Sequence, residues 1–386
     1  MDKLLIRNAR IISGEKIFSG DLLAINGKIA AVGSVTETDG AEVIDAGGQY
    51  LSAGFVDIHV HGGGGYDLMD GTVEALKGMS RTHLLTGTTT MLPTMVTSPF
   101  EKIISTVAAY KAALPECPNF AGLHLEGPFL SPKQKGAHNE ALLHSPTKEE
   151  TERLLAAGEG LIKRVTAAPE LDGMKEFAEA MKEAGVLLSL GHSDATADVA
   201  LDAFGNGFSH ITHLYSATPT VRKINQVVRA GVIEAAYLDD SVTVELIADG
   251  HHAAVEALQL AVKIKGTDNV ALVTDALRPA GTDVKESYLG EICPENRVIL
   301  EDGVAKLPDR SSFAGSIATC AMLLERGVNH YRLPLASVVK MITETPARIM
   351  KLDGKGVLTA GADADLVLFG DDLKVNRVFL AGKEAK

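Results

Sequence analysis

Residues 54–65 read GFVDIHVHGGGG, an apolar run that carries two histidines and continues into four glycines. Side chains alternate between the two faces of a strand, so Asp57, His59 and His61 share one face and the aliphatic residues between them share the other. Polar groups on a buried face are costly unless a metal, a hydrogen-bond network or solvent satisfies them. Glycine allows the backbone to turn sharply beyond the histidines. The stretch therefore predicts a buried strand that ends at a polar site.

Seven further apolar runs of strand length follow, and segments of helix length separate them. Near-continuous apolar runs are typical of parallel strands that are covered on both faces. Strand and helix alternating eight times predict an α/β fold, the parallel (β/α)8 TIM barrel. The eight expected strands are residues 55–62, 88–96, 120–127, 164–170, 186–193, 208–215, 242–250 and 269–277.

The two ends of the chain have a different pattern. Short strand-like runs with Gly and Asn turns fill residues 1–52 and return in residues 355–386. Two β-rich ends that flank one long middle segment predict a single small β-sandwich domain made from both chain ends. We expect residues 53–354 to form the catalytic barrel between them.

Composition limits the partners. The chain has 386 residues and a formal net charge of -13, which opposes nucleic acid as a partner because phosphate backbones attract basic surfaces. A small anionic substrate is compatible with this charge, because a local cluster of Arg and His can outweigh a distant field. No apolar run approaches the roughly 18 residues of a membrane span and the start lacks a signal-peptide core, so we expect a cytoplasmic protein without a membrane partner. Three widely spaced cysteines indicate buried apolar positions rather than a zinc site or disulfides: Cys117, Cys293 and Cys320.

Most of the expected barrel strands end in a histidine or a carboxylate. Active sites of TIM barrels lie at the C-terminal ends of the strands, so these side chains are expected to converge at one mouth. Polar loops alone would explain Ser, Asn, Lys and Gly at such positions better than this density of His and carboxylate. The residues are His61, Glu126, Glu170, His192, His213, Asp249 and Asp275.

Imidazole and carboxylate groups together suit zinc or ferrous iron. A single histidine of this kind is more often a core or loop residue, but four with a glutamate at strand ends favour a metal site. His124 and His210 are weaker candidates, and His210 is expected to face away from His213 as a structural residue. The predicted ligands are His59, His61, Glu126, His192 and His213.

Asp275 ends the last expected strand, in the run LVTDAL. A carboxylate beside a metal site can take a proton from water and later pass it to a leaving group. The alternative is an aspartate that caps the N-terminus of a helix.

Taken together, these motifs resemble the amidohydrolase superfamily: a first-strand H-x-H, a β domain made from both termini, and an Asp on the eighth strand. Several longer motifs closely resemble the family of N-acetylglucosamine-6-phosphate deacetylases within it. They are HLEGPFLSPKQKGAH (124–138), GHSDA (191–195), THLYSA (212–217), IADGHH (247–252) and LVTDA (272–276), and GKGVLTAGADADLVLF (354–369) resembles the return strands of the superfamily.

This resemblance implies a metal site without a carbamylated lysine, since no lysine ends a core strand and Glu126 stands in the ligand position. Some members of the family keep one metal and replace the H-x-H with Gln and Asn, whereas this chain retains both histidines. The resemblance therefore implies up to two divalent ions (Zn, Fe(II), Mn or Co) and no organic cofactor. One ion would be held by Glu126, His192 and His213, and the other by His59, His61 and a bridging Glu126.

The implied reaction is hydrolysis of the acetamide of N-acetylglucosamine 6-phosphate to glucosamine 6-phosphate and acetate, in amino-sugar catabolism. Asp275 would carry the proton, and His138 in KGAH would stabilise the oxyanion. The family's phosphate-binding arginine is expected to come from the neighbouring subunit, which implies a homodimer with shared active sites. The sugar phosphate would be contacted by Ala137, His138, Ser216, Ala217, His252, Phe313, Ala314, Gly315 and Ser316.

The segment after the sixth strand departs from the family. Many members read Asn-Ala-Met after the tyrosine, but this chain has Ser216, Ala217 and Thr218, followed by PTVRKINQVVRAG (219–231). Arg222 is the candidate for the phosphate, with Lys223 and Arg229 behind it, and the alternative is an exposed loop charge. This departure leaves open N-acetylgalactosamine 6-phosphate, another N-acyl sugar, or a cyclic amidase or deaminase activity on the same barrel. A barrel without catalysis is disfavoured, because the five expected ligands and Asp275 are intact.

Overall fold

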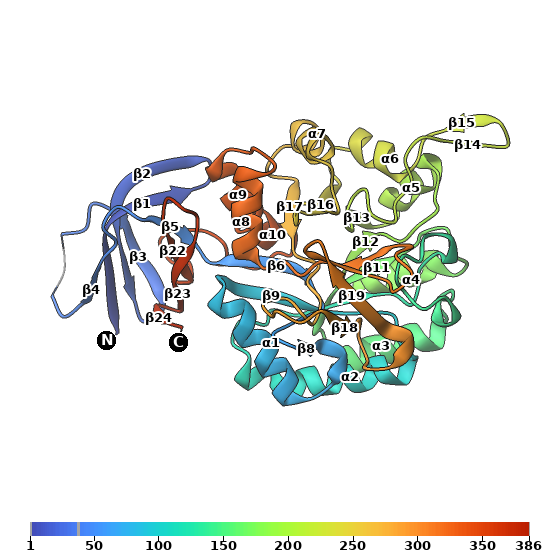
Figure 1. Ribbon diagram of the computed structural model, residues 1–386, viewed down its shortest axis with the longest axis horizontal. Helices are drawn as coiled ribbons and strands as arrows, with labels where there is room; N and C mark the ends of the chain where they lie inside the picture. Colours follow the sequence, from blue (N-terminus) through green and yellow to red (C-terminus); the bar gives the residue numbers. More distant parts are fainter. Residues whose placement is uncertain (1, 37–38, 386) are drawn as a thin grey trace.

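The computed structural model describes residues 2–36 and 39–385, and Figure 1 shows a barrel with a smaller β domain beside it. Eight parallel strands pair in sequence order around the barrel, which confirms the predicted (β/α)8 fold. An isolated parallel bridge between Val60 and Ala276 joins the first strand to the segment after the last. The strands are β6 (Phe55–Val60), β9 (Thr88–Met95), β10 (Leu123–Glu126), β11 (Ile162–Ala167), β12 (Leu187–Leu190), β13 (Phe208–Ile211), β16 (Thr243–Ile247) and β17 (Val270–Val273).

A helix follows each barrel strand along the chain, and two more helices complete the outer layer. The last of them, α10, packs against β6 and β17. The helices are α1 (Val73–Leu85), α2 (Phe100–Ala113), α3 (Lys148–Gly158), α4 (Met174–Glu183), α5 (Ala197–Gly205), α6 (Val232–Leu238), α7 (Val255–Lys265), α8 (Cys320–Asn329), α9 (Leu335–Met341) and α10 (Glu344–Ile349).

Alternate residues of the barrel strands meet two different environments. Leu123 and Leu125 of β10 belong to the apolar layer between strands and helices, where they cluster with residues such as Phe177 of α4. Burying one such side chain contributes roughly 1.5–3 kcal/mol. His124 and Glu126, on the opposite face of β10, are also buried, but their partners are polar side chains inside the barrel. The interior of this barrel is therefore a polar layer held by hydrogen bonds.

Both chain ends form one mixed β-sheet, at the left of Figure 1. Strand β22 pairs antiparallel with β5, so that Leu366 lies opposite Ala53 and the two ends are joined. The sheet has an apolar cluster of its own, which includes Ile11, Leu51 and Phe379. The strands are β1 (Lys3–Ser13), β2 (Lys16–Ile25), β3 (Lys28–Gly33), β4 (Glu42–Asp45), β5 (Tyr50–Ala53), β22 (Leu366–Phe369), β23 (Val375–Leu380) and β24 (Lys383–Glu384).

Two insertions extend the barrel at its C-terminal end, and neither was predicted. A hairpin of β14 (Arg222–Ile224) and β15 (Val227–Arg229) follows β13 and projects at the upper right of Figure 1. An antiparallel sheet lies between β17 and α8 and consists of β18 (Glu286–Tyr288), β19 (Arg297–Glu301), β20 (Val304–Lys306) and β21 (Phe313–Gly315).

The four glycines after His61 form a tight turn, with β7 (Gly62–Gly63) paired to β8 (Tyr66–Asp67). A Cβ atom on Gly62 would lie 2.4 Å from the backbone oxygen of Tyr66 and 2.7 Å from the backbone nitrogen of Arg278. Gly64 and Gly65 have φ values of 67° and 91°, which favour glycine. The run thus lets the loop pack closely against the segment that follows β17.

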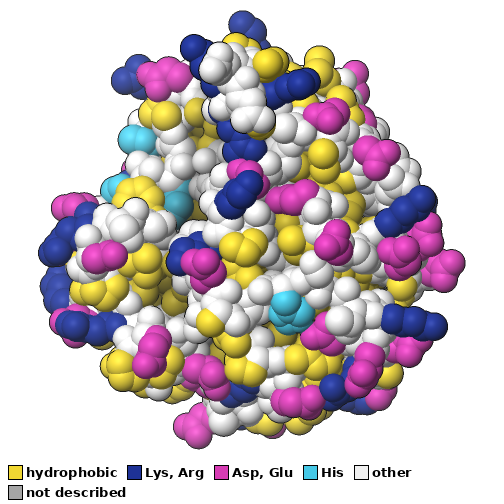
Figure 2. Space-filling model, turned by 90° about the vertical axis from the view of Figure 1, so that its right-hand side faces the viewer, with side chains coloured by type: hydrophobic (Ala, Val, Ile, Leu, Met, Phe, Trp, Pro, Cys, Tyr) yellow, Lys and Arg dark blue, Asp and Glu magenta, His cyan; other side chains and the backbone are white. Residues whose placement is uncertain are grey.

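Among the described residues, no helix combines the length and the apolar character that a membrane crossing requires. Figure 2 shows the face at the right of Figure 1, where basic and acidic side chains are interspersed. Such a mixture differs from the basic stripe that nucleic-acid binding requires.

Candidate active site at the mouth of the barrel

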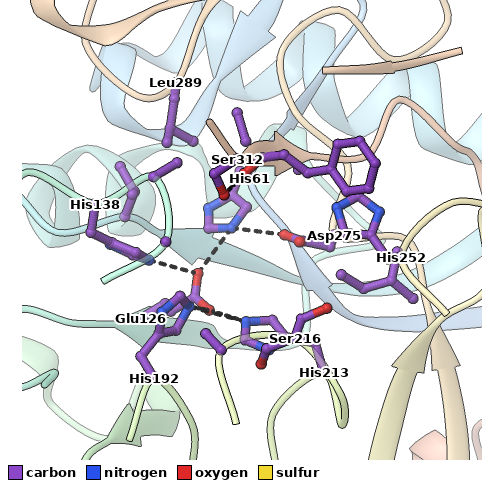
Figure 3. A pocket seen from close by; sticks show the side chains of 18 residues that line it. His61, Glu126, His138, His192, His213, Ser216, His252, Asp275, Leu289 and Ser312 are labelled. Atoms are coloured by element: carbon purple, nitrogen blue, oxygen red, sulfur yellow. Dashed lines mark hydrogen bonds and ion pairs between the residues drawn. The ribbon is translucent and has the colours of Figure 1, made fainter. Parts of the chain in front are cut away.

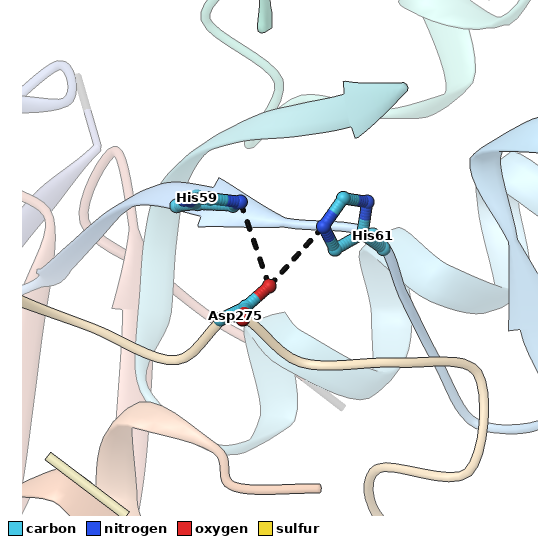
Figure 4. A group of neighbouring side chains, drawn as sticks. All are labelled: His59, His61 and Asp275. Carbon is cyan, nitrogen blue, oxygen red and sulfur yellow. Dashed lines mark ion pairs between the residues drawn. The ribbon is translucent and has the colours of Figure 1, made fainter. Parts of the chain in front are cut away.

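Six of the predicted residues meet at the C-terminal end of the barrel (Figures 3 and 4). His59 lies on β6 and Glu126 ends β10. The others follow their strands by one or two residues, and three of them have positive φ values: 47° at His192, 28° at His213 and 48° at Asp275. These left-handed positions turn the side chains from the strand ends toward the barrel axis, at a conformational cost that functional sites often carry.

The first group consists of Glu126, His192 and His213. Glu126 Oε1 lies 2.9 Å from Nε2 of His213 and 3.3 Å from Nε2 of His192. The two imidazole Nε2 atoms lie 3.1 Å from each other. One carboxylate and two imidazoles thus present three donor atoms to one point, a set that suits zinc or another divalent transition metal.

The second group consists of His59, His61 and Asp275 (Figure 4). Asp275 Oδ1 lies 3.1 Å from Nε2 of His61 and 3.5 Å from Nε2 of His59. Glu126 Oε2 lies 3.2 Å and 3.4 Å from the same two nitrogens, so this carboxylate reaches both groups. The geometry therefore adds Asp275 to the candidate ligands that the sequence indicated.

Hydrogen bonds fix the direction of the ring lone pairs. Nδ1 of His192 lies 2.8 Å from the carbonyl oxygen of Gln134, and Nδ1 of His213 lies 3.1 Å from that of Ser216. A carbonyl only accepts, so Nδ1 carries the proton in each ring and Nε2 of the neutral ring presents a lone pair. Two lone pairs that face each other in a buried site need a cation between them. Buried His59 Nε2 likewise has no hydrogen-bond partner, and the residues therefore fit a divalent metal.

The electrostatics of the site also favour positive charge. Burial lowers the pKa of His61, but hydrogen bonds to Asp275 and Glu126 outweigh this and raise that pKa to about 9. Burial raises the pKa of Asp275, but His59 and His61 outweigh it and lower that pKa below its ordinary value. The pKa of Glu126 lies well below its ordinary value, because His59, His192 and His213 outweigh the effect of burial. Both carboxylates are therefore ionised at neutral pH, and a divalent cation can replace the protons that they attract.

Two further histidines face the cavity beside these groups. Nδ1 of His138 lies 2.8 Å from the hydroxyl of Thr97, and its Nε2 lies 3.7 Å from Glu126. Burial, together with the nearby His192, lowers the pKa of His138 to about 3, so the ring is neutral. Nδ1 of His252 lies 2.8 Å from a carboxylate oxygen of Asp249, on the other side of the cavity.

The cavity between these side chains measures about 200 Å³. Its walls contain thirteen residues that the sequence singled out, among them Ser216, Ala217 and the segment Phe313–Gly315. The remaining wall residues are Val96, Gly136, Ile247, Leu289 and Ser312. A small polar molecule can therefore enter beside both metal-ligand groups.

The model of the amidohydrolase family matches residues 50–385. The chain belongs to the amidohydrolase family. It is 31% identical to an N-acetylglucosamine-6-phosphate deacetylase of Lysinibacillus sphaericus, over 98% of this chain and 97% of that protein. It is 32% identical to an N-acetylgalactosamine-6-phosphate deacetylase of Shewanella sp. (strain ANA-3), over 86% of this chain and 82% of that protein.

A solved structure extends this similarity. A point mutant of N-acetyl-D-glucosamine-6-phosphate deacetylase from Mycobacterium smegmatis, in complex with N-acetyl-D-glucosamine-6-phosphate, matches with a TM-score of 0.92. The two chains are 31% identical, and the match covers 100% of each. The similarity thus includes the β domain and the insertions of this amidohydrolase as well as its barrel.

Two predicted substrate residues lie away from the cavity of this amidohydrolase. Ser316 is fully buried, and its backbone nitrogen donates to the carbonyl oxygen of Asp275 at 3.0 Å. It supports the position of Asp275 and does not line the cavity. Arg222 lies on the hairpin β14–β15, where its guanidinium pairs with Asp194. Among the residues that the structure describes, Arg222 is therefore not one of those that line the cavity of its own chain.

Two other expectations change, those for His210 and Glu170, and one alternative, that Asp275 caps a helix, is excluded. His210 does not face away from the site, because β13 ends at Ile211 and strand alternation does not reach His213. Its ring points into the barrel, with Nε2 3.4 Å from Glu245. Glu170 lies outside the cavity, where it accepts hydrogen bonds from Ser193 and Asp194. Asp275 caps no helix, since α8 begins only at Cys320.

The wall residues that sequence reasoning missed carried weak signals. Gly136 lies within the motif KGAH and Ser312 directly precedes FAGS, so the same motifs could have indicated both residues. Val96 and Ile247 ended apolar runs and resembled ordinary core residues. Leu289 lies in an insertion without a periodic pattern.

Proposed function

We propose that this amidohydrolase hydrolyses the acetamide of N-acetylglucosamine 6-phosphate, which yields glucosamine 6-phosphate and acetate. The observation that carries the proposal is the meeting of Glu126, His192, His213 and Asp275 in one cavity. The full-length similarity to a deacetylase solved with this sugar phosphate supports the choice of substrate.

The proposed metal ligands are the two groups described above, with Glu126 between them. Zn, Fe(II), Mn and Co all accept this mixture of imidazole and carboxylate. When bound, such a cation supplies Lewis acidity toward a carbonyl oxygen and makes water a nucleophile near neutral pH.

Asp275 is the proposed proton carrier. Its carboxylate is ionised and reaches the cavity, so the oxygen that faces away from His59 and His61, Oδ2, can accept the proton of the attacking water. The same atom then returns the proton to the nitrogen of the departing amino sugar. The backbone nitrogen of Asp275 donates to the carbonyl oxygen of His59 at 2.9 Å, which holds the residue against β6 during both steps.

His138 is the proposed donor to the carbonyl oxygen of the acetamide. The hydroxyl of Thr97 can donate to Nδ1 of the neutral ring, and Nε2 then carries the proton toward the cavity. This proton is available for the oxygen that becomes negative when water attacks.

The sugar is proposed to lie between His252 and the segment Phe313–Gly315. Asp249 accepts a hydrogen bond from Nδ1 of His252, which leaves Nε2 of this ring available to a sugar in the cavity. The His252 ring packs 5.0 Å from that of Phe313. These two rings offer one polar contact and one apolar wall, as sugar sites require.

Arg222 is proposed to bind the 6-phosphate in the site of a second subunit. The hairpin that carries it projects from the barrel and also bears Lys223 and Arg229. An arginine can bind phosphate through two parallel hydrogen bonds. To do so, Arg222 would have to leave its ion pair with Asp194. Burial alone would raise the pKa of Asp194, but hydrogen bonds, chiefly the one from Arg222, outweigh burial and hold that pKa below its ordinary value. The protein would then be a homodimer with shared active sites.

A second candidate substrate is N-acetylgalactosamine 6-phosphate, because the Shewanella protein is as similar in sequence as several glucosamine enzymes. The two sugars differ in the configuration of one hydroxyl group. An acetate-release assay across both 6-phosphorylated sugars and their unphosphorylated forms separates the candidates. The proposal is supported if kcat/KM is highest for N-acetylglucosamine 6-phosphate. A higher kcat/KM for N-acetylgalactosamine 6-phosphate would make that sugar the substrate instead.

A further inference from the structure

A buried ion pair lies inside the barrel, next to the metal-ligand groups. Arg164 of β11 and Glu245 of β16 are both fully buried, and Nη1 of Arg164 lies 2.6 Å from Oε2 of Glu245. Charged side chains are almost never fully buried without a partner, and burying even a paired charge is costly. Neither residue lines the cavity, so a direct role in binding substrate does not explain them.

The second oxygen of Glu245 contacts both metal-ligand groups. Oε1 lies 2.7 Å from Nδ1 of His59 and 3.2 Å from the backbone nitrogen of His213. An ionised carboxylate only accepts hydrogen bonds, so Nδ1 of His59 carries the proton. Nε2 of the same ring then presents its lone pair to Asp275 and Glu126.

Arg164 holds this carboxylate in place through a network that reaches across the barrel to β6, to β16 and to the segment after β13. Its Nη1 also donates to the carbonyl oxygen of Ile58, the residue before His59, at 3.1 Å. Its Nη2 donates to Thr212, the residue before His213, at 3.0 Å. The guanidinium thus contacts the chain directly beside one ligand of each group.

We propose that Glu245, anchored by Arg164, is a positioning residue that fixes the ring of His59 for metal binding and links it to His213. Carboxylates that accept the second ring proton of a metal-binding histidine set its orientation, and their loss typically lowers metal affinity 10–100-fold. The inference rests on the proposed metal site but is independent of which amide is hydrolysed.

The test compares Glu245→Gln with a control from the same strand and network. Thr243→Val removes a buried hydrogen bond to His210 but touches neither metal-ligand group. Both variants and the unmutated chain are stripped with a chelator, checked for folding by circular dichroism, and titrated with Co²⁺. If two Co²⁺ ions bind, we expect Glu245→Gln to hold the weaker of the two about 10–100-fold less tightly than the unmutated chain does. The absorption spectrum of the bound Co²⁺ should also change. Thr243→Val should keep the original affinities and spectrum.

The double variant Arg164→Met/Glu245→Gln covers the case in which Glu245→Gln does not fold, because it removes the unpaired guanidinium. It should show the same loss of affinity. Selective ¹⁵N labelling of histidine in the unmutated holoprotein gives a readout that needs no folded Glu245 variant. The signal that disappears in His59→Asn should show a proton on Nδ1 that exchanges slowly with solvent.

Co²⁺ affinities that are equal in the folded glutamine variants and the unmutated chain would overturn the positioning role. So would a His59 ring whose Nδ1 carries no proton in the holoprotein. An unmutated chain that binds no Co²⁺ would instead reject the proposed metal site itself, so the two failures are distinguishable.

Discussion

Nε2 of His192 and Nε2 of His213 lie 3.1 Å apart, and each ring gives its Nδ1 proton to a backbone carbonyl. In the neutral rings both facing atoms are acceptors, so the pair is stable only with a cation near it. Glu126 adds a carboxylate oxygen at 2.9 Å from His213. The protein itself therefore specifies that positive charge is bound at this point.

Replacing Asp275 with Asn should lower kcat by about 10²–10⁴-fold, because the amide cannot carry the proton. The metal held by Glu126, His192 and His213 should remain, since Asp275 is not in that group. Acetate release and metal content are measured on the same sample. Glu170→Gln, at another strand end but outside the cavity, is the control and should keep normal turnover. Undiminished turnover in the Asp275 variant would reject this residue as the proton carrier.

Replacing Arg222 with Ala should raise KM for the 6-phosphorylated sugar much more than for the unphosphorylated sugar, because only the former loses a charge-assisted contact. Steady-state kinetics on both substrates measure this difference. Equal changes for the two would remove Arg222 from the phosphate site.

Mixed dimers of the same Arg222 variant show whether the arginine acts across subunits. Arg222→Ala and Asp275→Asn chains are unfolded and refolded together, so that some dimers contain one chain of each kind. If the arginine comes from the partner, the site of the Arg222→Ala chain in such a dimer has both an intact Asp275 and an intact Arg222. Activity should then exceed that of either variant alone. Activity no higher than the average of the separate variants would place Arg222 within its own chain or outside the site.

The stability of the protein should fall as the pH drops from about 6.5 toward 4, in part because of His210. Burial lowers the pKa of His210 to about 4, so the folded chain holds this ring neutral. The unfolded chain binds the proton first, with an ordinary pKa of about 6.5, and acid therefore favours unfolding. Urea unfolding at pH 7 and pH 5 should show a smaller loss of stability for His210→Gln than for the unmutated chain. An identical loss in both would exclude His210 as a contributor.

The sequence predicted the barrel because each strand is a near-continuous apolar run, and it indicated candidate metal ligands because strand ends meet at one mouth. His61, Glu126 and Asp275 needed only this rule and their residue types, and His59 followed because it shares a strand face with His61. The position of Arg222 could not be predicted, since the hairpin that carries it has no periodic signal. Ser316 was misjudged because a motif shows which residues are near a site but not which direction they face.

Arg164 and Glu245 were overlooked for a different reason. Arg164 begins the expected strand 164–170 and Glu245 lies within the expected strand 242–250, and attention went to the carboxylates near the ends of these runs, Glu170 and Asp249. A charge that precedes the C-terminal end of a strand buried on both faces is itself a signal, because it requires a buried partner. Applied to RVTAAPE and VTVELIADG, this rule would have indicated that the two residues pair inside the barrel.

The glycine turn after His61 gives a prediction about stability. Gly62→Ala should destabilise the fold by about 1–3 kcal/mol, because the added methyl group meets backbone atoms that cannot move independently. Gly205→Ala, at the end of α5, is the control, since no atom outside its own helix backbone and chain neighbours lies within 4 Å of the added Cβ. Thermal unfolding of the metal-free variants measures the difference. A Gly62 variant as stable as the Gly205 variant would show that the turn is not tightly packed.

Metal removal and restoration tests the central claim most directly. Acetate release from N-acetylglucosamine 6-phosphate is measured on the chelator-stripped protein, and again after addition of Zn²⁺, Fe²⁺, Mn²⁺ or Co²⁺, with elemental analysis of each sample. We expect negligible release without metal and recovery in proportion to bound metal. Full activity in a sample free of transition metals would contradict a metal-dependent reaction at this site.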